Sequence, residues 1–378
     1  MPNPNAVVSR VLRIDPPVDR ASTDDRGYAI ELESGQTVRL DPGNKNANGL
    51  ARVLDGLRQL RKPAYLEIDP ASSTITRLLI PYVTRVQGIR PVDDGVLSVE
   101  LEQSHARHVL RRQSPDFAEL EKALRDALYS RTPITVAETD AHEIIDVRPH
   151  RPLPDELPPF PRIEFPPFVP WSWDWIRHKL WRFWCWRWWP WCWIWCWLRR
   201  CCISPAYAQQ VFDAMSATSC APLTVPPPCI PFLYPDDGCW GRASEMCRLM
   251  INMGLHPKKV WIQGSLFVPT KNNPMCHVGW GWHVAPTLCV RGPKFWQSQD
   301  MVIDPSLFTT PVTPAAWKGV QGDPNATLTP SAASIFYLWG NQTDPGYVQT
   351  NIVLATYRLQ LQNRSLGPSG PPPYANCP

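Results

Sequence analysis

The chain has 378 residues, more than one hydrophobic core usually needs, so two domains joined by a connecting segment are predicted. Its net charge of +4 is small against 38 basic and 34 acidic residues, which argues against a general polyanion-binding surface and against nucleic acid as a partner. The first residues, MPNPNAVVSRVLRID, contain no apolar run and no small-residue cleavage site. No signal peptide is therefore expected, and any export would use another route.

The cysteines are confined to the second half of the chain. None of the twelve precedes Cys185, so the two halves differ in chemistry. Such a set suits either disulfides formed in an oxidising compartment or reduced, buried thiols, and both alternatives stay open. No CxxC pair is matched by a second Cys or His pair, so no structural zinc site is expected.

Residues 27–150 predict a small α+β module that contains one pattern twice. In each copy two strand-like segments precede an amphipathic helix and two more strand-like segments, at an offset of roughly 70 residues. The two predicted helices are GLARVLDGLRQL and FAELEKALRDAL. His105 and His108 lack a partner signature, so structural or surface roles are expected for them. Residues 1–150 are therefore predicted to be a duplicated α+β module with an inhibitory, delivery or binding role.

Two unusual segments follow this module. Residues 151–170 are rich in proline, which fixes the backbone and removes hydrogen-bond donors, so a stiff linker is predicted. Residues 171–200 hold twelve tryptophans with interspersed Arg and Lys. These charges and Pro190 disfavour a spanning helix, whereas tryptophan and basic residues suit the membrane interface. Either a membrane-interface contact by residues 171–200 or packing against the rest of the protein is expected.

Residues 201–378 contain the only constellation typical of catalysis. Cys239 stands at the start of the helical pattern in DGCWGRASEMCRLMINMG, with Gly254 as the stop signal. The positive end of a helix, aided by a histidine, lowers the pKa of a thiol. Cys239 is therefore predicted to be a nucleophile.

A histidine and an aspartate follow in strand-like segments. His283 lies within the apolar run GWHVAPTLCV, and Asp304 ends the run MVID just before a proline. A carboxylate at a strand exit can orient an imidazole on the neighbouring strand. A helix-borne cysteine followed by His and Asp on an antiparallel sheet is typical of papain-like and transglutaminase-like hydrolases, so an α+β fold of that class is predicted.

The blocks DGCWGRASEM, GWHVAPTLCV and VIDPSLFTTPVTPAAW resemble those of the bacterial protein-glutaminases, also called protein-glutamine deamidases, over residues 238–317. The resemblance implies that Cys239 attacks a glutamine side-chain amide of a protein or peptide, that His283 moves the proton, and that Asp304 orients His283. Glutamine becomes glutamate and ammonia leaves through a thioester intermediate, with no metal and no cofactor. Secreted relatives carry a signal peptide and a segment that occupies the cleft, whereas this sequence shows no such signal and has a duplicated module of different appearance. The proline-rich tether motivates the hypothesis that residues 1–150 act on the hydrolase in the same chain as a partner, delivery adaptor or inhibitor.

Trp240 and Trp282 flank the nucleophile and the base in sequence, so they either bind the glutamine methylenes or pack in the core. Other functions also fit these residues. The same triad suits a transglutaminase-like acyl transferase or a cysteine protease. The Trp-rich segment suits a membrane-active binding protein. For the deamidase itself, action as a toxin or effector on another cell's proteins is a further hypothesis.

Overall fold

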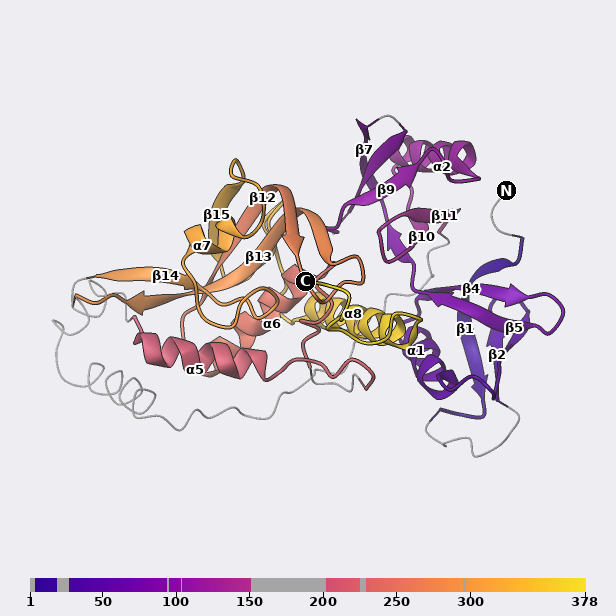
Figure 1. Ribbon diagram of the computed structural model, residues 1–378, viewed down its shortest axis with the longest axis horizontal. Coiled ribbons are helices and arrows are strands. Elements are labelled where there is room, and N and C mark those ends of the chain that lie inside the picture. Colours follow the sequence, from indigo (N-terminus) through magenta and orange to yellow (C-terminus); the bar gives the residue numbers. More distant parts are fainter. Residues whose placement is uncertain are drawn as a thin grey trace.

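The computed structural model describes residues 4–18, 27–93, 95–102, 104–150, 202–224, 229–294 and 297–378 (Figure 1). The predicted linker and the Trp-rich segment lie outside the described residues, so the predictions made for them stay predictions. Within the described part, no helix has both the length and the apolar character needed to cross a membrane.

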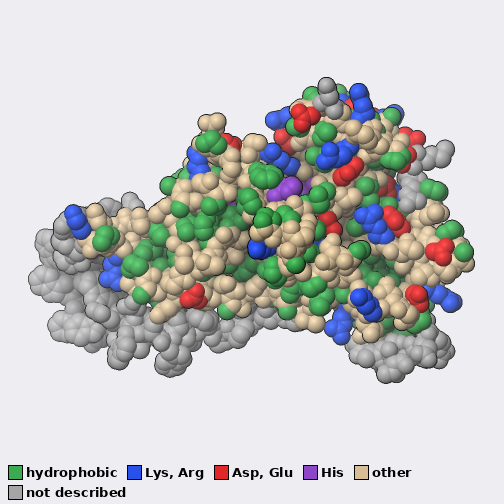
Figure 2. Space-filling view, in the orientation of Figure 1, with side chains coloured by type: hydrophobic (Ala, Val, Ile, Leu, Met, Phe, Trp, Pro, Cys, Tyr) green, Lys and Arg blue, Asp and Glu red, His purple; other side chains and the backbone are tan. Residues whose placement is uncertain are grey.

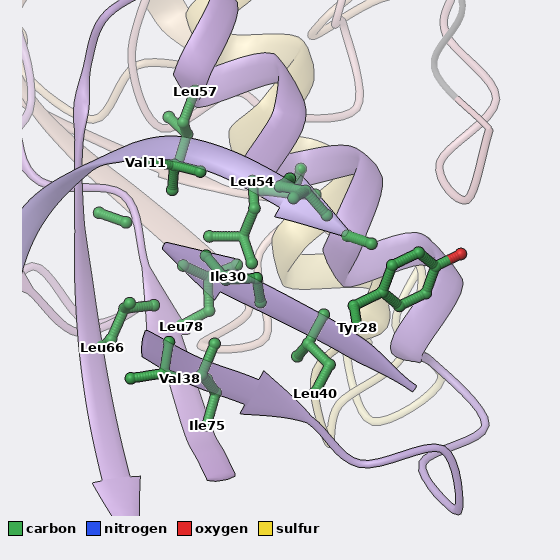
Figure 3. Packing of buried hydrophobic residues seen from close by; sticks show 14 of the residues in the cluster. Val11, Tyr28, Ile30, Val38, Leu40, Leu54, Leu57, Leu66, Ile75 and Leu78 are labelled. Atoms are coloured by element: carbon green, nitrogen blue, oxygen red, sulfur yellow. The ribbon is translucent and has the colours of Figure 1, made fainter. Parts of the chain in front are cut away.

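The first half of the N-terminal module is a small closed barrel with one helix. Its strands are hydrogen-bonded in the order β1-β2-β3-β5-β4. The elements are β1 Ala6–Asp15, β2 Tyr28–Leu32, β3 Thr37–Leu40, α1 Ala47–Gln59, β4 Pro63–Asp69 and β5 Thr74–Leu79. Alternating residues of β2 point inward and meet the apolar face of α1, as Figure 3 shows for Ile30 and Leu54. Sequence analysis predicted these elements except β1.

The second half repeats the order of elements but pairs its strands differently. It contains β6 Tyr82–Thr84, β7 Val86–Asp93, β8 Val96–Leu101, β9 His108–Arg111, α2 Phe117–Ser130, β10 Ile134–Glu138 and β11 Ile144–Pro149. The strands form two three-stranded sheets, β7-β8-β9 and β11-β10-β6, rather than a closed barrel. Leu120 and Leu124 of α2 are buried in the core of this half, as the predicted apolar stripe requires.

The C-terminal domain packs helices against an antiparallel sheet of order β14-β13-β12-β15. Its elements are α5 Pro205–Ser216, α6 Cys239–Asn252, β12 Lys258–Pro269, β13 His277–Arg291, β14 Ser298–Val302, α7 Pro314–Gly319, β15 Thr327–Ala332, β16 Ile335–Tyr337, β17 Gln342–Thr343 and α8 Val348–Leu366. The helix α6 is buried along nearly its whole length. An α+β fold is therefore observed, as predicted.

The described cysteines of this domain are largely paired. Disulfides join Cys202 to Cys289, Cys220 to Cys229 and Cys276 to Cys377. Cys239 and Cys247 are the free cysteines of the described part, and both are buried. The sequence left open disulfides or reduced, buried thiols. Six of the described cysteines form disulfides, and two are buried thiols.

The helix α8 joins the two parts of the molecule, since it runs from the sheet of the C-terminal domain to α1 (Figure 1). Gly49 and Gly56 of α1 allow this close approach, because a Cβ there would lie 2.7 Å from Leu366 and 2.5 Å from Leu359. Asn363 of α8 also donates a hydrogen bond of 2.9 Å to a carbonyl of the module. On the face in Figure 2, basic and acidic side chains are intermixed over the module. That face shows no broad basic surface.

Candidate active site

Cys239 is the first residue of α6, and its position is set by the glycine before it. Gly238 is the N-cap, with a φ of 82°, and a Cβ there would collide with the ring of Tyr357. Only glycine combines this left-handed backbone with so close an approach. The buried guanidinium of Arg242 donates to the carbonyls of Tyr234 and Asp237, at 3.0 and 2.6 Å, and fixes the preceding loop. The loop and the helix start thus hold the thiol in one place.

His283 lies in the middle of β13, and Asp304 follows the end of β14. His283 Nε2 donates to Asp304 Oδ2 at 2.9 Å, and Trp317 Nε1 donates to the same oxygen at 2.9 Å. Although burial opposes ionisation, these partners hold the pKa of Asp304 below its ordinary value. Burial lowers the pKa of His283, so its imidazole is neutral at neutral pH. A neutral ring held by a carboxylate is suited to accept a proton at its other nitrogen.

The N-terminal module contributes a third group to this cluster, His105. Cys239 Sγ lies 3.5 Å from His105 Nδ1, and the rings of His105 and His283 stack with centroids 5.8 Å apart. Within the described residues, His283 Nδ1 has no hydrogen-bond partner. The three residues predicted from the sequence therefore meet in one buried cluster, and His105 takes the contact with the thiol. Of the two roles expected for His105, the surface position was wrong, because the residue is buried.

The segment around His105 pairs with β13 as a short extra strand. Arg107 N donates to Gly279 O at 3.1 Å, and Gly281 N donates to His105 O at 2.9 Å. His105 Nδ1 also lies 2.9 Å from Trp282 O. These contacts resemble strand addition to a sheet edge, which fixes a segment through its backbone. The imidazole is thereby aimed at Cys239.

A chain of buried polar groups connects this segment to the loop before Cys239. Asp237 accepts hydrogen bonds from Ser104 Oγ at 2.6 Å and from His105 N at 3.1 Å. Ser104 Oγ also lies 2.8 Å from His108 Nε2, so His108, expected at the surface or in a structural role, is a buried structural residue. Burial raises the pKa of Asp237, against the effect of these partners.

The same network continues to α8. The carboxylate of Glu138 lies 2.6 Å from His108 Nδ1 and 2.7 Å from His142 Nδ1. Burial opposes both charges, yet the pKa of Glu138 falls to about 2 and that of His142 rises to about 10, because each charge faces the other. Arg364 donates to both oxygens of Asp236, at 2.7 and 2.9 Å, and Asp236 lies 3.4 Å from His142. The closed arrangement is thus held by ion pairs as well as by strand pairing.

The thiol itself does not have the predicted acidity in this arrangement. Burial raises the pKa of Cys239 well above its ordinary value, and Arg242 opposes this only partly. The expectation of a lowered pKa rested on the positive end of the helix, which favours the thiolate. In a site closed to water this effect is weaker than the effect of burial, which favours the neutral thiol. In the closed chain Cys239 is therefore a neutral thiol.

Trp240 and Trp282 are both buried beside the cluster. The ring of His105 lies 6.1 Å from that of Trp240 and 5.2 Å from that of Trp282. The two indoles are 5.7 Å apart and border the space that His105 fills. A cavity of about 610 Å³ lies elsewhere, between the module, Tyr234 and α8, and none of the predicted site residues lines it.

Comparison with known proteins gives consistent similarities. Residues 208–321 match the model of a family described as glutaminase. A crystal structure of pro-protein-glutaminase is 21% identical, with a TM-score of 0.49, and the match covers 79% of this chain and 99% of that one. A crystal structure of protein-glutaminase is 30% identical, with a TM-score of 0.36, covering 41% of this chain and 86% of that one. The protein-glutaminase from Chryseobacterium proteolyticum is also 30% identical, with a TM-score of 0.35 and coverages of 39% and 83%. None of the curated proteins matches.

Proposed function

Because the chain belongs to the protein-glutaminase family, we propose that Cys239, His283 and Asp304 catalyse the hydrolysis of glutamine side-chain amides in proteins. Protein-glutamine amidohydrolase activity, which converts glutamine to glutamate, is the function of the C-terminal domain. The observation that carries the assignment of residues is the burial of all three side chains in one cluster, with His283 held on Asp304 at 2.9 Å.

In the proposed reaction His283 Nδ1 takes the thiol proton, and the sulfur of Cys239 attacks the amide carbon. The negative charge that develops on the amide oxygen is stabilised by backbone N–H groups at the start of α6. His283 then returns the proton to the departing nitrogen, and ammonia leaves a thioester. A water molecule, deprotonated by His283, hydrolyses the thioester and releases glutamate. Asp304 stabilises the imidazolium in both steps.

We further propose that residues 1–150 inhibit the enzyme within the same chain. The support is that His105 contacts Cys239 and that the backbone of Arg107 is hydrogen-bonded to β13, the strand that carries His283. A glutamine side chain needs the space between Trp240 and Trp282, which His105 fills. Activity therefore requires that this segment leaves the site.

Two finer structural assignments belong to the same proposal. The placement of the Cys239 helix against β13 supports a papain-like or transglutaminase-like domain. The matching order of strands around α1 and α2 supports an internal duplication. The toxin or effector role, the linker at residues 151–170 and the membrane contact of residues 171–200 stay predictions. Acyl transfer and peptide cleavage are alternatives that use the same three side chains.

Ammonia release from a glutamine-rich protein tests the proposed function. The intact chain, the chain after limited proteolysis of its N-terminal module, and Cys239→Ala treated in the same way are compared. Activity after proteolysis that is absent from Cys239→Ala supports the proposal. Equal activity of the variant would overturn the assignment of the nucleophile. Mass spectrometry of the substrate distinguishes amide-to-acid conversion from crosslinks or chain cuts.

A further inference from the structure

The cluster at Cys239 contains three side chains of the types that bind transition metals. Cys239 Sγ and one ring nitrogen each of His105 and His283 lie within 4.8 Å of one another, and all three residues are buried. The thiol is not in a disulfide. Among the described residues, His283 Nδ1 has no hydrogen-bond partner. An unpartnered buried nitrogen is costly, and a bound cation would satisfy it.

The separation of Cys239 and His105 and the atom types of all three residues suit zinc. Zinc bonds of about 2.3 Å to sulfur and about 2.0 Å to nitrogen, at a tetrahedral angle, place the two ligand atoms about 3.5 Å apart. Cys239 Sγ and His105 Nδ1 are separated by 3.5 Å. A thiolate with two imidazoles is also a ligand set that favours zinc over magnesium or calcium.

Each histidine has a carboxylate behind it, as metal-binding histidines usually do. Asp304 Oδ2 lies 2.9 Å from His283 Nε2. Asp237 Oδ1 lies 3.3 Å from His105 Nε2. Such carboxylates fix which ring nitrogen carries the proton and make the other nitrogen a better ligand.

We propose that the closed chain binds one Zn²⁺ ion between Cys239, His105 and His283, and that this ion holds the inhibitory segment in the active site. His105 comes from the N-terminal module and the other two ligands from the C-terminal domain, so the ion bridges both parts. The regulatory consequence rests on the proposed function, but the binding of zinc does not.

The proton balance is simple. In the metal-free chain the contact of His105 Nδ1 with the carbonyl of Trp282 requires a proton on Nδ1. On binding, the hydrogen bond from Nδ1 to Trp282 O breaks, the proton moves to Nε2, which faces Asp237, and zinc takes its place on Nδ1. Cys239 loses its proton to solvent as the sulfur–zinc bond forms. One proton is thus released per ion, and a divalent charge compensates for burying a thiolate.

A second cluster in the module must be distinguished from this one. His108, Glu138 and His142 also place three ligand atoms within 4.8 Å of one another. Their polar atoms already satisfy each other, because both oxygens of Glu138 accept from the two histidines. This second cluster contains no cysteine. A sulfur-to-metal absorption band therefore reports only on the site at Cys239.

Cobalt(II) substitution of the full chain tests the proposal. Titration of the intact protein with Co²⁺ is expected to produce a sulfur-to-metal absorption band that saturates at one equivalent and is abolished by Zn²⁺. Competition with a chromophoric chelator gives the zinc affinity. His105→Ala should weaken that affinity by at least about 100-fold, since loss of an outer-shell partner alone costs about 10- to 100-fold. His105→Cys restores a ligand and should recover most of it.

Two variants serve as controls. His277→Ala removes an imidazole that is not one of the three proposed ligands. Its Nδ1 lies 2.8 Å from Met275 O, so the zinc affinity should be unchanged. Glu138→Gln disrupts the second cluster and should keep the sulfur band. The proposal is overturned by the absence of a sulfur band in the intact chain, by a band that survives in Cys239→Ala, or by zinc binding that only Glu138→Gln removes. Because no substrate is used, an inactive protein can pass this test and an active one can fail it.

Discussion

The sulfur of Cys239 lies 3.5 Å from a ring nitrogen of His105, a residue 134 positions earlier in the chain. The imidazole that contacts the nucleophile is therefore not the one that Asp304 holds. His283 is stacked behind it and has an unpartnered Nδ1. In this arrangement the thiol is buried and neutral, and it does not donate a hydrogen bond to Nδ1 of His283. The proposed inhibition thus acts on both of the proposed catalytic groups at once.

Removing the imidazole of His105 is expected to increase the activity of the intact chain. His105→Ala loses ring contacts with Trp280 and Trp282, each worth about 0.5–1.5 kcal/mol. A loss of about 1.4 kcal/mol shifts the closed state toward the open one by about tenfold. Ammonia release should rise by at least about that factor. His277→Ala is the matched control, and an unchanged rate in His105→Ala would contradict the inhibitory role.

Asp304→Asn is expected to remove most of the activity of the opened enzyme. The amide keeps the shape of the side chain but does not stabilise an imidazolium at His283, which costs about 10⁴-fold in kcat in a triad. The measurement is made in the His105→Ala background so that the site is open. Asp300→Asn, a partly exposed residue of β14, serves as control. Equal rates of the two variants would remove Asp304 from the mechanism.

Much of this site could be predicted because local patterns place each of the three proposed catalytic residues. Each residue belongs to an element that its neighbours in sequence define: a helix begins at Cys239, and apolar runs around His283 and Asp304 define strands. A helix packed against neighbouring strands can bring these three positions together. The position of His105 depends instead on how two domains pack, which no local pattern encodes. One signal was present. The connection between paired strands is 33–36 in the first copy but the longer 102–107 in the second, which contains His105.

The paired sheets could not be derived from the same patterns. Alternation of apolar residues predicts that a segment is a strand but not which neighbour it bonds. The barrel around Ile30 and the separate sheets around Val99 therefore arise from similar sequences. The raised pKa of Cys239 was missed for a related reason, because burial under His105 outweighs the helix start.

The stability of the N-terminal module should depend on pH through Glu138 and His142. The pKa of His142 rises from 6.5 to about 10, so its contribution is complete below pH 6.5 and is lost as the pH rises toward 10. The pKa of Glu138 falls from 4.5 to about 2, so its contribution is complete above pH 4.5 and is lost as the pH falls toward 2. Asp236, which faces His142, and Arg364, which pairs with Asp236, stay charged between these limits.

The measurement is the urea midpoint of unfolding across this range. The midpoint should be highest between pH 4.5 and 6.5 and should decline above 6.5. His142→Gln keeps a polar side chain that does not titrate, so the alkaline decline should be reduced. An alkaline decline of the same size in the variant would assign the effect to other groups.

Gly238→Ala should displace Cys239 and reduce both stability and activity. The residue has a φ of 82°, and the added methyl would meet the ring of Tyr357, which is itself buried. A left-handed non-glycine residue costs about 1–3 kcal/mol before any collision is counted. Gly35→Ala is the matched control, because its φ is 84° and nothing lies within 4 Å of the new Cβ. The control measures the backbone term alone. Any further loss of stability in Gly238→Ala measures the fit of the helix start against Tyr357. The rate of ammonia release, measured in the His105→Ala background, should fall as well. Equal effects of the two glycine substitutions would show that this fit does not position the nucleophile.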